Sequence, residues 1–203
     1  SVPFVIIDGT VGELDSVAFF PDRGAAYDRE QAKARFLSGD FEIRSQTLLD
    51  NYGFTDDVLW FAFRVLNRST QGSGTMLEIQ ENNLADVRVY INRENYAGPG
   101  VWTEEASGAN MAIRQRPVPV VGLVFNAALP PASESLFLIR VDNRGPNRLH
   151  FKVDTAGKVM ASLAEHDAWL LGCFGALFVL VLYNVLLFVS VRDRVFLWFT
   201  LQL

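Results

Sequence analysis

The strongest constraint on this chain is a long apolar run near its C-terminal end. No residue from 169 to 191 is charged, and a helix of this length reaches roughly 34 Å at a rise of about 1.5 Å per residue. Because the hydrocarbon core of a bilayer is about 30 Å thick, this run is long enough to cross a membrane. We therefore predict a transmembrane helix over residues 169–191.

The charges on either side of this run predict its orientation. Acidic residues precede it, whereas Arg192 and Arg194 follow it in the short turn 192–194. Since cytoplasmic loops carry an excess of Lys and Arg, we expect the turn in the cytoplasm and residues 1–168 in the periplasm or another extracytoplasmic space. Apolar character resumes over residues 195–203, which are too few to span alone and are expected to begin a second, truncated membrane helix.

The part of the chain before the membrane helix is expected to be a folded domain. We predict an extracytoplasmic domain over residues 1–160, joined to the helix by a juxtamembrane link over residues 161–168. The only cysteine, Cys173, lies inside the apolar run, so this domain has no disulfide framework and depends on its own core. The chain carries a net charge of −5 at pH 7 and no basic run, which argues against nucleic acid as a partner.

Alternation of apolar and polar residues predicts that this domain is mainly β. Many short alternating segments with few helices are typical of an antiparallel β-sandwich or jelly roll. One helix is expected over residues 28–37, because Asp28 and Gln31 have the spacing of a capping box and Gly39 follows as a stop. The strands are expected at residues 2–7, 16–20, 59–66, 75–81, 86–91, 118–125, 135–142 and 149–153.

The same alternation assigns one face of three strands to the core. Within residues 59–66, every second side chain is large and apolar, so that these side chains share one face. Equivalent sets occur in residues 86–91 and 135–142. The predicted core residues are Leu59, Phe61, Phe63, Val65, Val87, Val89, Ile91, Phe137, Ile139 and Val141.

The opposite faces of these three strands carry the predicted ligand site, provided that the strands share one sheet. Aromatic rings suit the faces of sugars, and guanidinium groups suit carboxylates or phosphates, so we expect an acidic or highly hydroxylated ligand. In the alternative interpretation, the arginines are only the solvated side of the sheet, and Trp60 is core beneath the 28–37 helix. The predicted site residues are Trp60, Arg64, Arg88, Tyr90 and Arg140.

The sequence contains no motif for catalysis, and we expect neither a cofactor nor a bound metal. It has no glycine-rich phosphate loop and no Cys or His spacing for a transition metal. Its two histidines have no motif that would support a catalytic triad, so a tethered hydrolase is the least favoured class. The acidic loop at residues 50–57 could offer oxygen ligands to a structural calcium ion, but it does not have EF-hand spacing, and a solvated turn is favoured.

Two groups of residues resemble the bacterial seven-transmembrane receptors with diverse intracellular signalling modules. The first group is similar to the junction between the first and second membrane helices of that family, and the second to the centre of its type 2 extracellular domain. The first group is Leu182-Tyr183-Asn184, Leu187-Phe188, Ser190, Arg192-Asp193 and Phe196-Leu197, and the second is Tyr52-Gly53-Phe54-Thr55, Trp60, Arg64 and Asn67.

The resemblance implies a receptor in the bacterial inner membrane. Its jelly-roll sensor domain would be similar to carbohydrate-binding modules and would bind a carbohydrate-like ligand. It would control a cytoplasmic output domain, either the histidine kinase of a two-component system or a diguanylate cyclase. The alternative is a periplasmic module that binds another protein, or forms a homodimer, without any small-molecule ligand.

Overall fold

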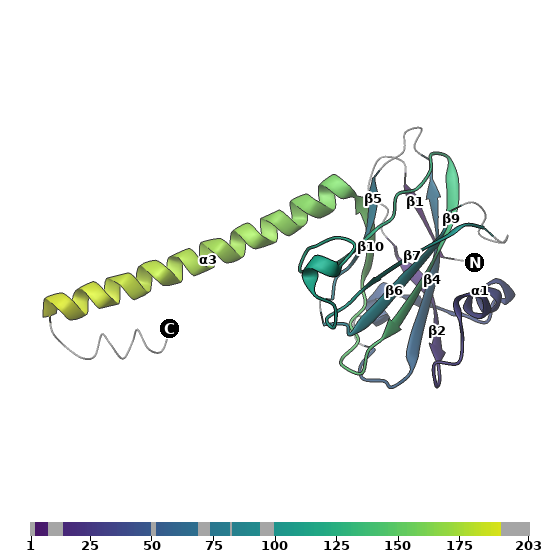
Figure 1. Cartoon of the computed structure of the whole chain (residues 1–203), viewed down its shortest axis with the longest axis horizontal. Helices are drawn as coiled ribbons and strands as arrows, with labels where there is room; N and C mark the ends of the chain where they lie inside the picture. The colour runs from purple at the N-terminus through teal and green to yellow at the C-terminus, as the bar shows by residue number, and fades with distance from the viewer. Residues whose placement is uncertain are drawn as a thin grey trace. The chain divides into compact units, whose positions relative to one another are not determined.

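The structure is a computed structural model, and it describes residues 3–7, 14–49, 52–68, 74–81, 83–93 and 100–191 of the 203-residue chain. The chain divides into two compact units, Ser1–Val159 and Met160–Leu203. The first unit is mainly β, as predicted (Figure 1). The elements are β1 (Phe4–Ile7), β2 (Ser16–Asp22), α1 (Arg29–Ser38), β3 (Glu42–Ser45), α2 (Gln46–Leu49), β4 (Val58–Asn67), β5 (Thr75–Ile79), β6 (Asp86–Asn92), β7 (Trp102–Ser107), the 3-10 helix η1 (Ile113–Gln115), β8 (Leu123–Asn126), β9 (Ser133–Asp142), β10 (Phe151–Thr155) and α3 (Ala156–Val191).

The strands form two sheets that pack as a β-sandwich, which confirms the predicted fold class. The larger sheet has seven strands, six of which lie in the order β3-β2-β4-β9-β6-β7. The smaller sheet has three strands, in the order β10-β5-β8. The seventh strand of the larger sheet, β1, runs parallel to the second half of β4, whereas β2 is antiparallel to the first half. The three strands predicted to carry the site, β4, β9 and β6, are therefore neighbours in one sheet.

The core between the sheets contains every residue that the alternation predicted. All ten predicted side chains are buried in one cluster with the inward side chains of the smaller sheet, such as Leu77 and Phe151. Phe63 stacks on Phe137 with ring centroids 5.2 Å apart and lies 6.2 Å from Phe151 of the opposite sheet. The prediction of the core-facing residues of β4, β6 and β9 is therefore confirmed.

A second core lies on the outer face of the larger sheet, beneath α1 (Figure 1). The predicted helix is confirmed, since the Asp28 carboxylate accepts from the Gln31 N–H at 2.8 Å and the Gln31 side chain accepts from the Asp28 N–H. Gly39 ends it with a φ of 85°, the left-handed conformation that favours glycine. The second core comprises Ala18, Ala32, Phe36, Phe41, Val58, Trp60, Ala62, Tyr90, Leu136 and Leu138.

Some predicted strand boundaries are wrong. Residues 118–125 are not one strand, because only Leu123–Asn126 pairs, with β5. The preceding prolines, Pro117 and Pro119, lack the N–H that a strand donates, and Arg116 instead donates to the carbonyls of Gly108, Met111, Val120 and Val121. The last strand begins at Phe151 rather than at 149, and the edge strands β3 and β7 were not predicted.

The predicted membrane helix lies within the longer helix α3. This helix also includes the expected link over residues 161–168, which is helical. Most of its large apolar side chains, such as Leu171 and Phe174, are exposed, and the helix is long and apolar enough to cross a membrane. The predicted cytoplasmic turn 192–194 and the second helix over 195–203 lie outside the described residues.

Candidate functional site

All five predicted site residues lie on the outer face of the larger sheet, but they do not form one cluster. Arg140 of β9 is paired in register with Trp60 of β4 on one side and with Arg88 of β6 on the other. Tyr90 follows on the same face of β6. Arg64 lies four residues beyond Trp60 along β4, roughly 14 Å away at about 3.4 Å per residue, and it pairs with Glu134. The structure therefore brings Arg88 and Arg140 together and separates Arg64 from them.

The two aromatic rings of the predicted site belong to the second core. Trp60 is 1% exposed and Tyr90 is 8% exposed, and their rings stack with centroids 6.1 Å apart. The Trp60 indole N–H donates to the buried carboxylate of Asp22 at 3.2 Å. The alternative interpretation of Trp60 as core beneath the helix is therefore confirmed. Trp60 is thus closed to solvent, and the Arg29 guanidinium of α1 lies 5.9 Å from the centre of the Tyr90 ring.

The two neighbouring arginines form an ion-pair network that we call the arginine cluster. Arg140 contacts Asp86 at 3.5 Å and Asp142 at 3.3 Å, and Arg88 contacts Asp86 at 3.3 Å and Glu104 at 3.7 Å. The carboxylate of Asp86 raises the pKa of the Arg88 guanidinium above its ordinary value. Two cations thus face three carboxylates, so an anionic ligand would have to displace a carboxylate that is already in place.

A hollow of about 540 Å³ adjoins the arginine cluster at one end of the sheet. We call it the loop-end hollow, because three loops surround it and two carboxylates of the arginine cluster reach it. Amide, carboxylate and guanidinium groups dominate its lining, and such groups can both donate to and accept from hydroxyls. Its lining comprises Asn83, Ala85, Asp86, Ala109, Asn110, Asp142, Asn143, Arg144 and Gly145.

The loops around this hollow are held together before any ligand arrives. The Ala85 N–H donates to the Asn143 side chain at 3.3 Å, and the Ala109 N–H donates to the Leu84 carbonyl at 2.8 Å. Gly108 lies so close to Ala85 that a Cβ atom there would fall 2.2 Å from the Ala85 carbonyl oxygen. Preorganisation of this kind lowers the entropy that binding must offset.

Sequence reasoning did not identify the loop residues of this hollow. Asn83, Asn110 and Asn143 come from separate loops, and no motif or spacing in the sequence links them. In the acidic loop considered for calcium, Asp50 lies outside the described residues. Within the part of the chain that the structure describes, no group of three His, Cys, Asp or Glu side chains is placed to hold a metal ion.

Several solved structures are similar to this chain, at low identity. A carbohydrate-binding module of the β-sandwich superfamily is 11% identical, with 72% of this chain and 54% of that chain covered and a TM-score of 0.30. A second module, solved in complex with β-1,4-galactotriose, is 8% identical, with coverage of 68% and 88% and a TM-score of 0.32. A β-glucuronidase from Ruminococcus gnavus is 12% identical, with coverage of 70% and 24% and a TM-score of 0.36.

The search of curated proteins gave no match. A family model, in contrast, matches most of the chain. It spans residues 14–155, which include every strand from β2 to β10. The matching model describes 7TMR-DISM extracellular 2, and the chain therefore belongs to this family of type 2 extracellular domains of seven-transmembrane receptors with diverse intracellular signalling modules.

Proposed function

We propose that this chain is the ligand-sensing extracytoplasmic domain and first membrane helix of a signalling receptor in the bacterial inner membrane. The observation that carries the proposal is the direct connection between the domain and the helix. Strand β10 ends at Thr155 and α3 begins at the next residue, Ala156, whose N–H donates to the Gly74 carbonyl at 2.7 Å. Val159 in the first turn of α3 is fully buried. A displacement of β10 would therefore reach the helix without a flexible loop between them.

The ligand that we propose is carbohydrate-like or acidic, and the geometry favours a hydroxylated and uncharged molecule. The loop-end hollow offers both donors and acceptors, and the arginines beside it are already neutralised by carboxylates. Its volume is within the range of small-molecule sites, which is about 300–1,000 Å³. Of the predicted site residues, Arg88 and Arg140 would contribute to this site by holding the carboxylates of Asp86 and Asp142, which line the hollow.

The receptor would control a cytoplasmic output domain, either a histidine kinase or a diguanylate cyclase. The family to which the chain belongs is defined by diverse intracellular signalling modules, which supports an output of this type. A second candidate function is a periplasmic module that binds another protein or a second copy of itself. It is supported by two exposed apolar side chains at one edge of the larger sheet, Ile43 of β3 and Leu48 of α2.

The test is a thermal shift measurement on the chain in lipid nanodiscs, with a panel of neutral sugars and uronic acids. We expect at least one neutral sugar to raise the melting temperature of the domain. This rise should be lost in Asp142→Asn and retained in Arg44→Ala, a matched control because Arg44 pairs with Glu42 at the far edge of the same sheet. If no compound stabilises the protein and light scattering shows a stable dimer, the second function replaces the first.

A further inference from the structure

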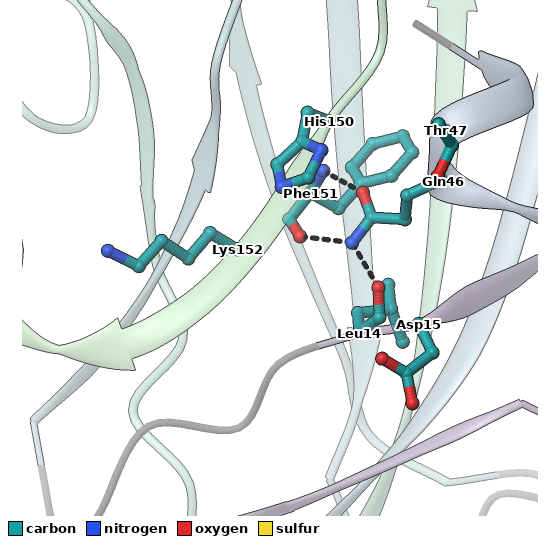
Figure 2. Close-up of a pocket in the computed structure, with 7 residues that line it drawn as sticks. All are labelled: Leu14, Asp15, Gln46, Thr47, His150, Phe151 and Lys152. Carbon is teal, nitrogen blue, oxygen red and sulfur yellow. Dashed lines mark hydrogen bonds between the residues drawn. The ribbon is translucent and has the colours of Figure 1, made fainter.

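Side chains occupy both edges of the smaller sheet. At β10, the buried amide of Gln46 donates to the Phe151 carbonyl at 2.9 Å and accepts from the Phe151 N–H at 2.6 Å (Figure 2). At β8, the Asn126 N–H donates to the Glu105 carboxylate at 2.8 Å. A strand from another chain would have to displace these side chains before it could pair there. The larger sheet is therefore the better place for an additional strand.

Of the two outermost strands of the larger sheet, β7 opposes pairing with a copy of itself. It carries Glu104 and Glu105 at adjacent positions. If two antiparallel copies paired over the whole strand, Glu104 of each would lie opposite Glu105 of the other, and like charges at such positions are destabilising. Charged side chains on an edge strand commonly prevent such pairing.

Strand β3, the other outermost strand, has an open edge. The Gln46 N–H, one residue after β3, donates to the Asp15 carbonyl at 3.1 Å. Because residues of antiparallel strands alternate between bonding to the neighbour and facing away from it, the N–H and C=O groups of Ile43 and Ser45 face away from β2. Both residues are exposed, and no strand of the described chain pairs with this side of β3.

The side chains of β3 complement a second copy of the same strand. If two antiparallel copies are centred on Ile43, Glu42 of each copy lies opposite Arg44 of the other. Glu42 and Arg44 share the inner face of the sheet, because they pair in register with the core residues Phe19 and Val17 of β2. The opposite charges of the two copies would therefore meet on one face, and directly opposed pairs of this kind stabilise a sheet.

We propose that two copies of this chain associate through β3, in an antiparallel pair centred on Ile43. The contact is isologous, since each copy contributes the same strand. Ile43 is 48% exposed in a single copy, and its counterpart in the second copy would shield it. The loop-end hollow is lined by residues of other strands and loops, so the pair leaves it open to a ligand.

The pair is expected to form in a membrane rather than in dilute solution. Strand β3 has four residues, and so short an edge buries less than the roughly 1,200–2,000 Å² of a stable interface. Anchoring by α3 would raise the effective concentration of the two domains. The proposal names the partner in the second candidate function, and only this effect of concentration rests on the proposed membrane location.

Oxidative cross-linking of the chain in isolated bacterial membranes tests the pair. New cysteines are placed in a Cys173→Ser chain, which lacks the only native cysteine. We expect Ile43→Cys to form a disulfide-linked dimer, because the two Cα atoms would be about 5.5 Å apart, within the range of about 4.4–6.8 Å that a disulfide spans. Ser45→Cys is the matched control on the same edge, because its two copies would be roughly 14 Å apart at about 3.4 Å per residue.

Charge variants of the Ile43→Cys chain test the register. Glu42→Arg and Arg44→Glu should each lower the cross-linked fraction several-fold, because each places like charges opposite one another. Expression of both variants in the same cells should recover the cross-link, since each chain then supplies the charge that the other lacks. This recovery would also show that both variants fold.

The proposal is overturned by equal cross-linking at positions 43 and 45, by charge variants that leave the cross-link unaltered, or by mixed variants that do not recover it. If a sugar still raises the melting temperature in that case, the receptor function stands and only this interface is wrong. A cross-link specific to position 43, in a protein that no sugar stabilises, supports the pair and the second candidate function together.

Discussion

Replacement of Phe63 by alanine should destabilise the domain strongly, and the structure allows the size of the effect to be worked out. Phe63 is fully buried in β4, stacks on Phe137 of the adjacent strand and contacts Phe151 of the opposite sheet. A Phe→Ala change in a core lowers the free energy of unfolding by about 3–5 kcal/mol, because apolar burial is lost and a cavity remains. The stacking of two rings accounts for about 0.5–1.5 kcal/mol beyond their burial. We therefore expect a loss near the middle of the first range, about 4 kcal/mol.

The assay is unfolding of the chain in lipid nanodiscs, followed by tryptophan fluorescence during heating and in urea. For a domain of this size, a loss of 4 kcal/mol should lower the melting temperature by roughly 8–16 °C. Phe54→Ala is the matched control, because Phe54 is 78% exposed and its loss should change the unfolding free energy by no more than about 0.5 kcal/mol. Equal melting temperatures for the two variants would refute the assignment of the core face of β4.

Three further predictions concern topology, pH and the ligand site. In intact cells, a membrane-impermeant thiol reagent should label Ser162→Cys and spare Asp193→Cys, and the reverse pattern would contradict the orientation of α3. Burial raises the pKa of the Tyr90 phenol above its ordinary value of 10.0. The stability that the neutral, buried phenol gives to the folded domain is therefore fully present below pH 10 and is lost as the pH rises through the raised pKa of the folded state. Absorbance titration should show a late-ionising phenol that Tyr90→Phe removes, and a titration unchanged in this variant would exclude the effect. Because Arg64 lies apart from the arginine cluster, the ligand site is tested by Arg140→Ala alone, which should leave the domain folded and abolish ligand-induced stabilisation. An unaltered response would show that the arginine cluster takes no part in binding.

The sequence predicts those strands of the sandwich that bury one face against the other sheet, because their apolar and polar residues alternate. The alternation around Phe63 and Phe137 assigns the core correctly, and the capping box of Asp28 and Gln31 locates α1. The edge strands escaped prediction because they are half exposed and polar, as in Trp102–Ser107, and therefore lack a hydrophobic pattern. In residues 118–125 the alternation was misleading, since it says nothing about the backbone N–H groups that proline removes.

The candidate site could be predicted only in part, because alternation gives the face of a residue but not its partners. Alternation correctly placed Arg88 and Arg140 on one face of the sheet. It could not show that carboxylates neutralise them, because this requires the strand register that puts Asp86 opposite Asp142. The burial of Trp60 depends on where α1 packs. Likewise, a hollow of about 270 Å³ is lined by both Asp15 and His150, which are far apart in the chain and come near each other only in the folded sandwich.

The burial of β4 on both faces has a consequence for how the protein reaches its folded state. Residues 58–63 are all buried and carry no charge, and they are flanked by Asp57 and Arg64. Until α1 and the smaller sheet cover it, this run of aromatic and aliphatic residues is of the type that pairs with copies of itself in other chains. Its neighbour β9 contains a second such run at residues 136–139. Self-association of unfolded chains should therefore compete with folding, so the yield of refolded domain should fall as the protein concentration rises.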